Sequence, residues 1–193
     1  MRRNALSTGL MTAALVLGAP AAASADDDSS SPSCADPLIE HPFAPFGDDR
    51  DFMLAPGGSF DGDDTSWRLN DDARVDGGSL VLRDGGRATS PATCVDLDYE
   101  IMRFKYRAPS NPDADLEVEV RYPGTGDSWN EVAEIEAGEG RDMGDGWFLS
   151  DDVPVRPELG GSEPGWRHVK IRLRGDEGKW SVDDVYVDPK RRS

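Results

Sequence analysis

The stretch "YEIMRFKYRAPSNPDADLEVEVRY", residues 99–122, decides the fold, because apolar and charged side chains alternate in it twice around a single turn. Apolar residues at 102, 104 and 106 alternate with basic residues at 103, 105 and 107, and the pattern returns over 115–122 with acidic partners. A period of two residues predicts a half-buried β-strand. The Pro- and Asn-rich segment between the two runs is typical of a turn. We therefore predict two strands, each with one dry face and one wet face.

The same pattern extends along the chain on both sides of this stretch. "WRHVKIRLRG" (166–175) alternates apolar and basic residues, "GSLVLRDGG" (78–86) is a short apolar run between glycines, and no segment shows an apolar stripe of helical period. Gly-, Pro- and Asp-rich turns separate the strands. We predict an all-β, single-domain, antiparallel jelly-roll β-sandwich. We also expect the basic row of 99–107 to face the acidic row of 115–122 across one solvated surface.

The N-terminus has the layout of a secretory signal peptide. Arg2 and Arg3 precede the apolar run "LMTAALVLGAP", and "AASADDD" offers a cleavage site after Ala25. The apolar run is shorter than the ~20 residues of a membrane-spanning helix, so we expect export and no membrane span. The expected organisation is a signal peptide (1–25), a disordered leader (26–33), the β-sandwich domain (34–190) and a basic tail (191–193).

The charge balance excludes one class of partner. The chain has 38 acidic and 21 basic residues, a formal net charge of -17, and loss of the signal peptide makes it more negative still. Such a chain repels the phosphate backbone, so we expect no nucleic-acid partner. Solubility outside the cell accounts for most of the acidic residues, and cation binding is the functional alternative.

Two cysteines, Cys34 and Cys94, are present in a chain that we expect to be exported. An even count in an oxidising compartment predicts a disulfide, whereas metal and redox sites usually have closer spacing. The bond would close a loop of about 60 residues and stabilise the fold by roughly 4 kcal/mol on the chain-entropy model. We assign it a structural role.

The segment "GKWSVDDVYVDP", residues 178–189, places two adjacent aspartates in an apolar strand. Neighbouring residues of a strand point to opposite faces, so at least one of Asp183 and Asp184 is expected to turn toward the buried side. A buried carboxylate needs a partner. The candidates are turn amides, an arginine such as Arg68 or Arg74, or a metal ion.

Two motifs resemble those of jelly-roll carbohydrate-binding modules, which have an early "G-x-F-E" followed by a tryptophan and a late "W-x-I-D-D-V". They read "GGSFDGDDTSW" (57–67) and "WSVDDVYV" (180–187) here. Residues 34–190 as a whole look more like a group of small secreted actinobacterial proteins of unestablished function. The resemblance implies a sandwich of the galactose-binding-like kind.

The resemblance also implies a structural calcium ion, with Asp61 and Asp183 as ligands and Asp184 as a substitute. Asp61 stands where the family pattern has glutamate, and its shorter side chain puts bidentate coordination there in doubt. Calcium takes six to eight oxygen ligands, and the stretch 57–64 offers carboxylates and backbone carbonyls together. The spaced pattern of a helix-loop-helix calcium site is absent.

No catalytic motif is present. The two histidines, His41 and His168, are far apart, and there is no G-x-S-x-G elbow, H-E-x-x-H zinc site or phosphate-binding loop. With 38 acidic residues the sequence nominates no pair of glycosidase carboxylates. We expect a protein without turnover, and a small polysaccharide hydrolase or lyase is the alternative.

The binding prediction rests on tryptophans. Trp67 and Trp180 are assigned to the core, while Trp129, Trp147 and Trp166 are the candidates for a ligand surface, because an exposed indole is a platform for a sugar ring. We predict a secreted recognition module for an extracellular glycan. The alternative is a structural or protein-interaction module of the cell envelope, and exposure of Trp129 and Trp147 on one surface distinguishes the two. Ligand identity and oligomeric state do not follow from the sequence.

Overall fold

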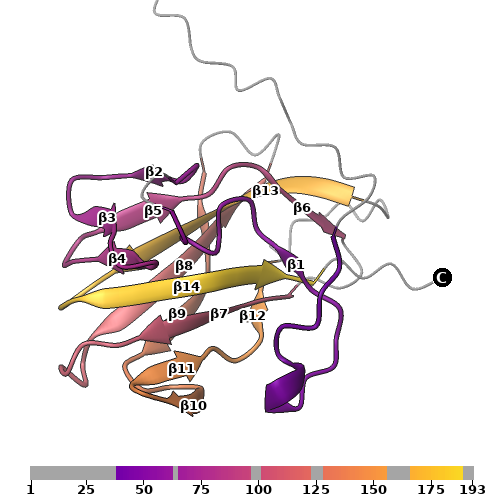
Figure 1. Ribbon diagram of the computed structural model, residues 1–193. Coiled ribbons are helices and arrows are strands. Elements are labelled where there is room, and N and C mark those ends of the chain that lie inside the picture. The colour runs from indigo at the N-terminus through magenta and orange to yellow at the C-terminus, as the bar shows by residue number, and fades with distance from the viewer. Residues whose placement is uncertain (1–37, 63–64, 97–100, 123–127, 156–165, 189–193) are drawn as a thin grey trace, which may run out of the picture. The chain divides into compact units, whose positions relative to one another are not determined.

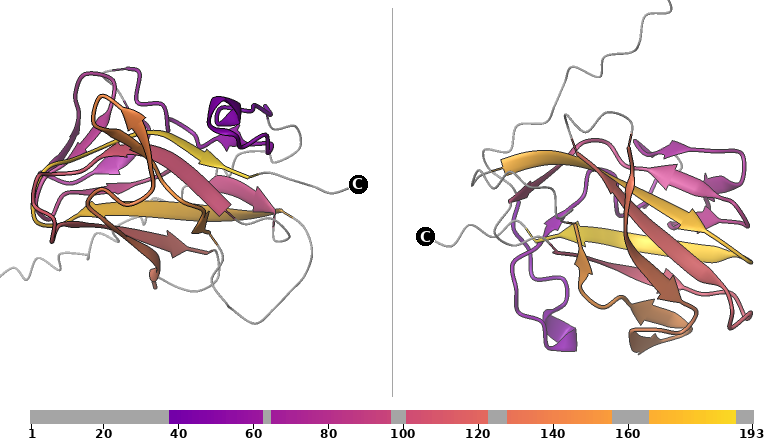
Figure 2. Two further views of the ribbon diagram at one scale, coloured as in Figure 1. Left: turned by 90° about the horizontal axis from the view of Figure 1, so that it is seen from below. Right: turned by 180° about the vertical axis from the view of Figure 1, so that it is seen from behind.

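Two stacked antiparallel β-sheets form the protein (Figures 1 and 2). The computed structural model describes residues 38–62, 65–96, 101–122, 128–155 and 166–188. The described residues fall in one compact unit, and their only helix is the 3-10 turn η1 (Ala44–Phe46). None of their helices is long and apolar enough to cross a bilayer.

The first sheet is built around two long neighbouring strands, β7 and β14. Its hydrogen-bonded order is β10 (Arg141–Gly144), β11 (Trp147–Leu149), β7 (Ile101–Arg107), β14 (Trp180–Val187), β4 (Leu80–Leu82) and β3 (Ala73–Val75), with β1 (Met53–Leu54) paired to β14 and β12 (Val153–Pro154) paired to β7.

The second sheet is built around β13, the longest strand. Its order is β2 (Arg68–Leu69), β5 (Arg87–Thr89), β13 (Trp166–Gly175), β8 (Asp115–Arg121) and β9 (Asn130–Glu136), with β6 (Thr93–Asp96) paired to the start of β13. The chain passes from one sheet to the other at every connection except β3–β4, β5–β6, β8–β9, β10–β11 and β11–β12. The predicted antiparallel jelly-roll β-sandwich is confirmed.

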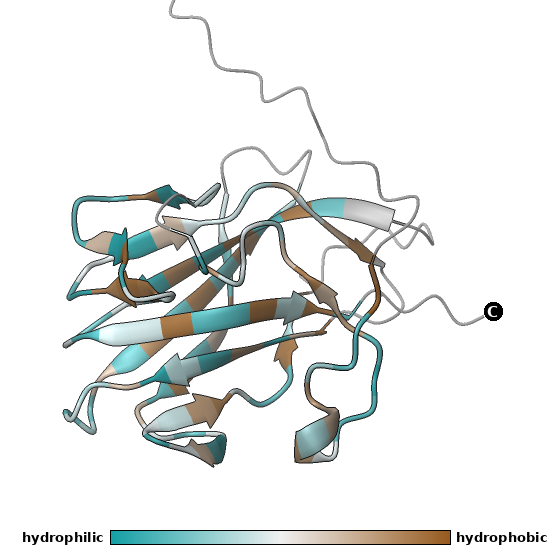
Figure 3. Cartoon of the chain, viewed as in Figure 1, coloured by the Kyte–Doolittle hydropathy of each residue, from teal (hydrophilic) through white to brown (hydrophobic). Residues whose placement is uncertain are grey.

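The core lies between the sheets and follows the predicted alternation, which is visible as bands along the strands in Figure 3. The inward side chains of β8 and β13 pack against those of β7 and β14. Trp67 and Trp180 are also buried there, as predicted. The largest contributions come from side chains with no exposed surface: Met102, Phe104, Tyr106, Leu116, Val118, Val120, Val169, Ile171, Leu173 and Trp180.

A β-bulge in β14 answers the question raised by the two adjacent aspartates. Asp183 is opposite Lys105 and Tyr186 is opposite Arg103, so β14 has one residue more than β7 over this interval. Asp184, at a φ of 51°, lies in the left-handed region that aspartate tolerates better than most residues. The extra residue lets Val182 and Val185 both face the core while neither carboxylate does. The expectation that one aspartate turns inward is therefore wrong.

The expected pairing of the basic and acidic rows is also wrong. β7 lies beside β14 in the first sheet, whereas β8 lies beside β13 in the second. The row on β7 is not uniformly wet either, because Arg103 is buried. The sequence shows which residues alternate, but only the strand order shows which rows meet.

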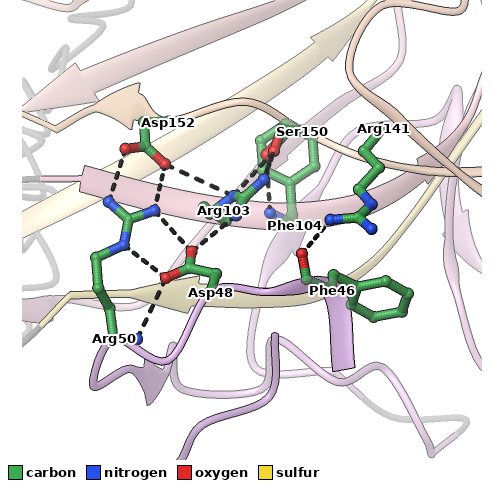
Figure 4. A network of polar contacts seen from close by, with 8 residues as sticks. All are labelled: Phe46, Asp48, Arg50, Arg103, Phe104, Arg141, Ser150 and Asp152. Carbon is green, nitrogen blue, oxygen red and sulfur yellow. Dashed lines mark hydrogen bonds and ion pairs between the residues drawn. The ribbon is translucent and has the colours of Figure 1, made fainter. Parts of the chain in front are cut away.

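The segment before β1 covers part of the outer face of the first sheet. Phe43 and Phe52 pack there against Leu149 and Tyr186 in a second, smaller core cluster. Arg103 is buried beneath this segment, and the polar network that holds the segment in place is drawn in Figure 4. The guanidinium of Arg103 donates to the Ser150 carbonyl at 2.7 and 2.9 Å and to the Asp48 carboxylate at 2.8 Å.

Asp48 is shared by two arginines. Arg50 donates to both of its oxygens, at 2.7 and 2.6 Å, and also bridges to Asp152 at 2.7 Å. The Arg50 contact first, and then Arg103, hold the pKa of Asp48 well below its ordinary range, although burial opposes this. This network ties the segment around Asp48 and Arg50 to the first sheet.

Candidate functional site: an arginine and glutamate hollow on the second sheet

A ladder of ion pairs crosses the outer face of the second sheet. The register of β13 and β8 places Arg172 opposite Glu119 and Arg174 opposite Glu117. Arg172 donates to Glu119 at 2.9 Å, and Arg174 donates to both oxygens of Glu117 at 2.8 and 2.9 Å. Each pair arises from the alternation of the two strands, because the same period that buries Leu173 and Val118 turns their neighbours outward.

A hollow of about 340 Å³ lies over this ladder. Its volume is at the small end of the range for small-molecule sites. Among the described residues, no aromatic or aliphatic side chain lines it. The lining residues are Gly85, Arg87, Glu117, Glu119, Arg172 and Arg174.

The turn before β5 positions Arg87 at the rim of the hollow. The side chain of Asn70 donates to the Gly85 carbonyl at 3.0 Å and accepts from the backbone N–H of Arg87 at 2.7 Å. Gly86 is required inside this turn, since a Cβ there would lie 2.7 Å from backbone atoms of Arg83 and Asp72. The backbone that carries Arg87 is thus held on both sides while its side chain stays exposed.

Trp129, a predicted ligand residue, lies beside the hollow in a different role from the expected one. It is half-buried just before β9, and the guanidinium carbon of Arg172 is 3.7 Å from its ring centroid. Arg121 also approaches the ring, at 5.3 Å. The indole therefore orders the arginine of the ladder, and the ring face under Arg172 is not open to a sugar.

The other predicted ligand tryptophans do not join Trp129. Trp147 begins β11 in the first sheet, where it is half-buried and Arg107 lies 4.6 Å from its ring centroid. Trp166 begins β13, but its side chain lies outside the described residues. Trp129 and Trp147 therefore belong to different sheets and form no common aromatic platform. The criterion that the sequence set for a glycan surface is not met, so any glycan site has to rest on other groups.

The arginines and glutamates of the hollow were not predicted as site residues. Their signal in the sequence was the alternation of 115–122 and 166–175, which indicated two wet strand faces. Nothing in the sequence showed that the two faces lie side by side, nor that Arg87 comes next to them.

The two aspartates at the β14 bulge lie on the first sheet, apart from the hollow. Asp184 is paired with Lys105. Asp183 accepts the backbone N–H of Asp184 at 2.8 Å. Burial, and then the charge of Asp184, raise the pKa of Asp183 to about 7, and Asp61 adds to the rise.

The predicted calcium ligands are Asp61, Asp183 and Asp184, and all three are among the described residues. Asp61 is exposed and close enough to Asp183 to affect its titration, and Asp183 is a half-buried carboxylate with too little opposite charge around it. The ion pair with Lys105 engages Asp184. Within the described ranges, no three acidic, histidine or cysteine residues are gathered to hold a metal ion. The chemistry of Asp61 and Asp183 suits a hard cation, and the calcium site remains a prediction.

Only one cysteine of the predicted disulfide lies among the described residues. Cys94 is buried in β6, next to the start of β13. Cys34 lies outside the described residues, as do the predicted signal peptide, leader and tail. The pairing of Cys34 with Cys94 remains a prediction.

Comparisons with known proteins give structural neighbours alone. No family model and no curated protein matches the sequence. Among solved structures, a family 15 xylan-binding module has 11% identity and a TM-score of 0.46 over 68% of this chain and 95% of its own. A family 29 carbohydrate-binding module from Piromyces equi has 11% identity and a TM-score of 0.46 over 72% of this chain and 90% of its own. A xylan-binding domain from Paenibacillus barcinonensis has 14% identity and a TM-score of 0.43 over 70% of this chain and 94% of its own. These neighbours are jelly-roll carbohydrate-binding modules, and similarity at this level identifies neither a ligand nor a site in this chain.

Proposed function

We propose that the protein is a carbohydrate-binding module and that the hollow over β5, β13 and β8 is its binding site. One observation carries the proposal: Arg172 is held between Trp129 and Glu119, so a planar set of hydrogen-bond donors is already ordered at the hollow. A group that is ordered before the ligand arrives loses little entropy on binding.

The chemistry of the hollow suits a sugar. A saccharide presents neighbouring hydroxyls that both donate and accept hydrogen bonds. Guanidinium groups of Arg172 and Arg174 offer donors, and carboxylates of Glu117 and Glu119 offer acceptors. Charged partners give shorter and stronger hydrogen bonds than neutral ones. The absence of apolar side chains from this lining disfavours an apolar ligand.

The same geometry favours recognition over turnover. A glycosidase needs one carboxyl group that keeps a proton and a second one that is ionised. Both carboxylates in the hollow already accept hydrogen bonds from arginines at 2.8–2.9 Å, so their oxygens are engaged by guanidinium groups. Asp183, whose pKa is raised, lies on the other sheet. A hydrolase or lyase is therefore the weaker candidate.

We further propose that Asp61 and Asp183 bind a structural calcium ion at the β14 bulge. A divalent cation would supply the positive charge that the half-buried Asp183 lacks, and it would tie the loop around Asp61 to β14. Asp184 is left out of the ligand set, since Lys105 already neutralises it. We place the module outside the cell, in keeping with the predicted signal peptide.

Affinity electrophoresis of the protein through gels with neutral or acidic polysaccharides tests the carbohydrate proposal. We expect at least one polymer to retard the wild type, and we expect the joint variant Arg172→Ala/Glu119→Gln to lose about tenfold or more in affinity. The control variant Arg74→Ala/Asp76→Asn removes an exposed ion pair of the first sheet and should bind normally. A folded wild type that binds no polysaccharide overturns the proposal and favours the protein-interaction alternative.

A further inference from the structure

We infer that the hollow selects an acidic saccharide, with Arg87 as the residue that binds the ligand's carboxylate. This inference rests on the proposed carbohydrate function and adds the chemical class of the ligand. It starts from the charge balance of the lining, which has three arginines and two glutamates.

The two glutamates are already neutralised. Glu117 and Glu119 accept from Arg174 and Arg172, and the side chains of both glutamates are only 22% and 17% exposed. Their remaining lone pairs can accept from sugar hydroxyls, but they leave no negative charge for a further cation. The ion pairs therefore form the neutral, hydroxyl-binding part of the hollow.

Arg87 is the one cation of the lining without such a partner. It has no ion pair with any described residue, and its side chain is exposed at the rim. The bonds from Asn70 fix its backbone, so the guanidinium projects from a defined position. A guanidinium presents two parallel N–H groups that match a carboxylate, and this geometry favours a uronate over a neutral sugar.

Strand β9, at the edge of the sheet away from Arg87, carries acidic side chains that would orient such a ligand. Glu134 and Glu131 on β9 lie opposite Glu117 and Glu119, so carboxylates stand in rows along this edge of the sheet. Asp115 first, and other acidic neighbours after it, raise the pKa of the exposed Glu134, as expected where like charges gather. A ligand carboxylate is repelled from the β9 side and attracted to Arg87 on the β5 side. The electrostatics thus favour one orientation of the sugar.

The test compares one short oligosaccharide in two charge states, because the net negative charge of the chain repels a long polyanion. Digalacturonate and its methyl-esterified form have the same backbone and hydroxyls, and they differ in the charge of the carboxyl groups. By isothermal titration calorimetry we expect the wild type to bind the acidic form at least tenfold more tightly. Arg87→Gln should lower the affinity for the acidic form to that for the ester, and Arg87→Lys should retain part of the preference.

Arg68→Gln is the matched control. Arg68 is an exposed arginine of β2 in the same sheet, and it does not line the hollow. We expect it to keep the preference for the acidic form. Thermal unfolding of each variant should match the wild type, because neither side chain is buried.

The outcomes separate this inference from the function on which it rests. Equal affinity for acid and ester, tighter binding of the ester, or a preference that survives Arg87→Gln overturns the inference. If only other, neutral polysaccharides bind, the inference fails and the carbohydrate proposal stands. If neither of these two oligosaccharides nor any polysaccharide binds, the carbohydrate proposal fails as well.

Discussion

The guanidinium of Arg172 lies 3.7 Å from the ring centroid of Trp129 while it donates to Glu119 at 2.9 Å. This contact joins β13 to the segment that enters β9, across the intervening strand β8. An arginine between an indole and a carboxylate has little rotational freedom left. In the proposed site, Trp129 would therefore act on a ligand through Arg172, and this role differs from that of a platform for a sugar ring.

Replacement of Trp129 separates these two roles. We expect Trp129→Leu to lower the free energy of unfolding by about 1–2 kcal/mol, through loss of the cation–π contact and of packing. Affinity for the polysaccharide should fall about threefold to tenfold, since Arg172 must then be ordered on binding. Chemical denaturation and calorimetric titration measure the two effects.

Trp147→Leu is the control for this prediction. It removes a similar contact between a tryptophan and an arginine, Arg107, but on the first sheet. We expect a comparable loss of stability with unchanged affinity. An equal loss of affinity in both variants contradicts a specific role for Trp129.

The ion pair between Asp48 and Arg103 leads to a prediction about stability. Their side chains are 10% and 11% exposed, so loss of the Asp48 charge leaves the buried Arg103 with only the more distant carboxylate of Asp152, at 3.7 Å, as a compensating charge. We expect Asp48→Asn to lower the free energy of unfolding by about 2–4 kcal/mol. Asp76→Asn, which breaks the exposed pair with Arg74, should cost less than about 0.5 kcal/mol. If urea denaturation gives similar losses of stability for both variants, a special contribution of the buried ion pair is contradicted.

The ion pair between Asp48 and Arg103 also predicts a loss of stability at acid pH. The pKa of Asp48 is lowered in the folded state, so its contribution to stability is fully present above the ordinary aspartate pKa of about 4 and is lost as the pH falls further. We expect the stability difference between wild type and Asp48→Asn to shrink progressively below pH 4. Urea midpoints measured from pH 7 to pH 2 follow it, and a constant difference over this range contradicts the mechanism.

The sequence predicted the layers of this fold better than its surfaces. Alternation along residues 101–107 and 166–175 was sufficient for the strands, because core burial demands it. It could not show that Arg172 and Glu119 are neighbours, since strand order is set by contacts remote in the chain. Burial of Arg103 was also invisible, because it depends on a covering segment more than fifty residues away.

The bulge at Asp184 illustrates a further limit. Strict alternation predicted at least one inward carboxylate. One extra residue in β14 shifts the alternation, so that Val182 and Val185 both face the core. The local signal was present in the sequence, as two polar residues side by side within an apolar strand. That pattern fits either a buried charge or a bulge, and only the pairing with β7 distinguishes them.

Asp183 gives the last prediction, in which pH and calcium act in opposite directions. Its pKa is raised to about 7 in the folded state, first by burial and then by Asp184. Between about pH 4 and pH 7 the unfolded chain therefore ionises first, and this residue makes the protein less stable as the pH rises. In EDTA at pH 8 we expect Asp183→Asn to be about 1–2 kcal/mol more stable than the wild type, with little difference at pH 4.

Calcium should reverse this order. A cation held by Asp61 and Asp183 binds the folded state alone, so the wild type should gain about 2.7 kcal/mol when free calcium is 100 times its dissociation constant, while Asp183→Asn should gain little. Asp113→Asn, an exposed change in the turn between β7 and β8, should follow the wild type in both series. A wild-type midpoint that is unmoved by calcium contradicts the metal proposal. If Asp183→Asn and the wild type are equally stable in EDTA at pH 8, the destabilising effect of the buried charge is contradicted. The two results are independent, because the EDTA series contains no calcium.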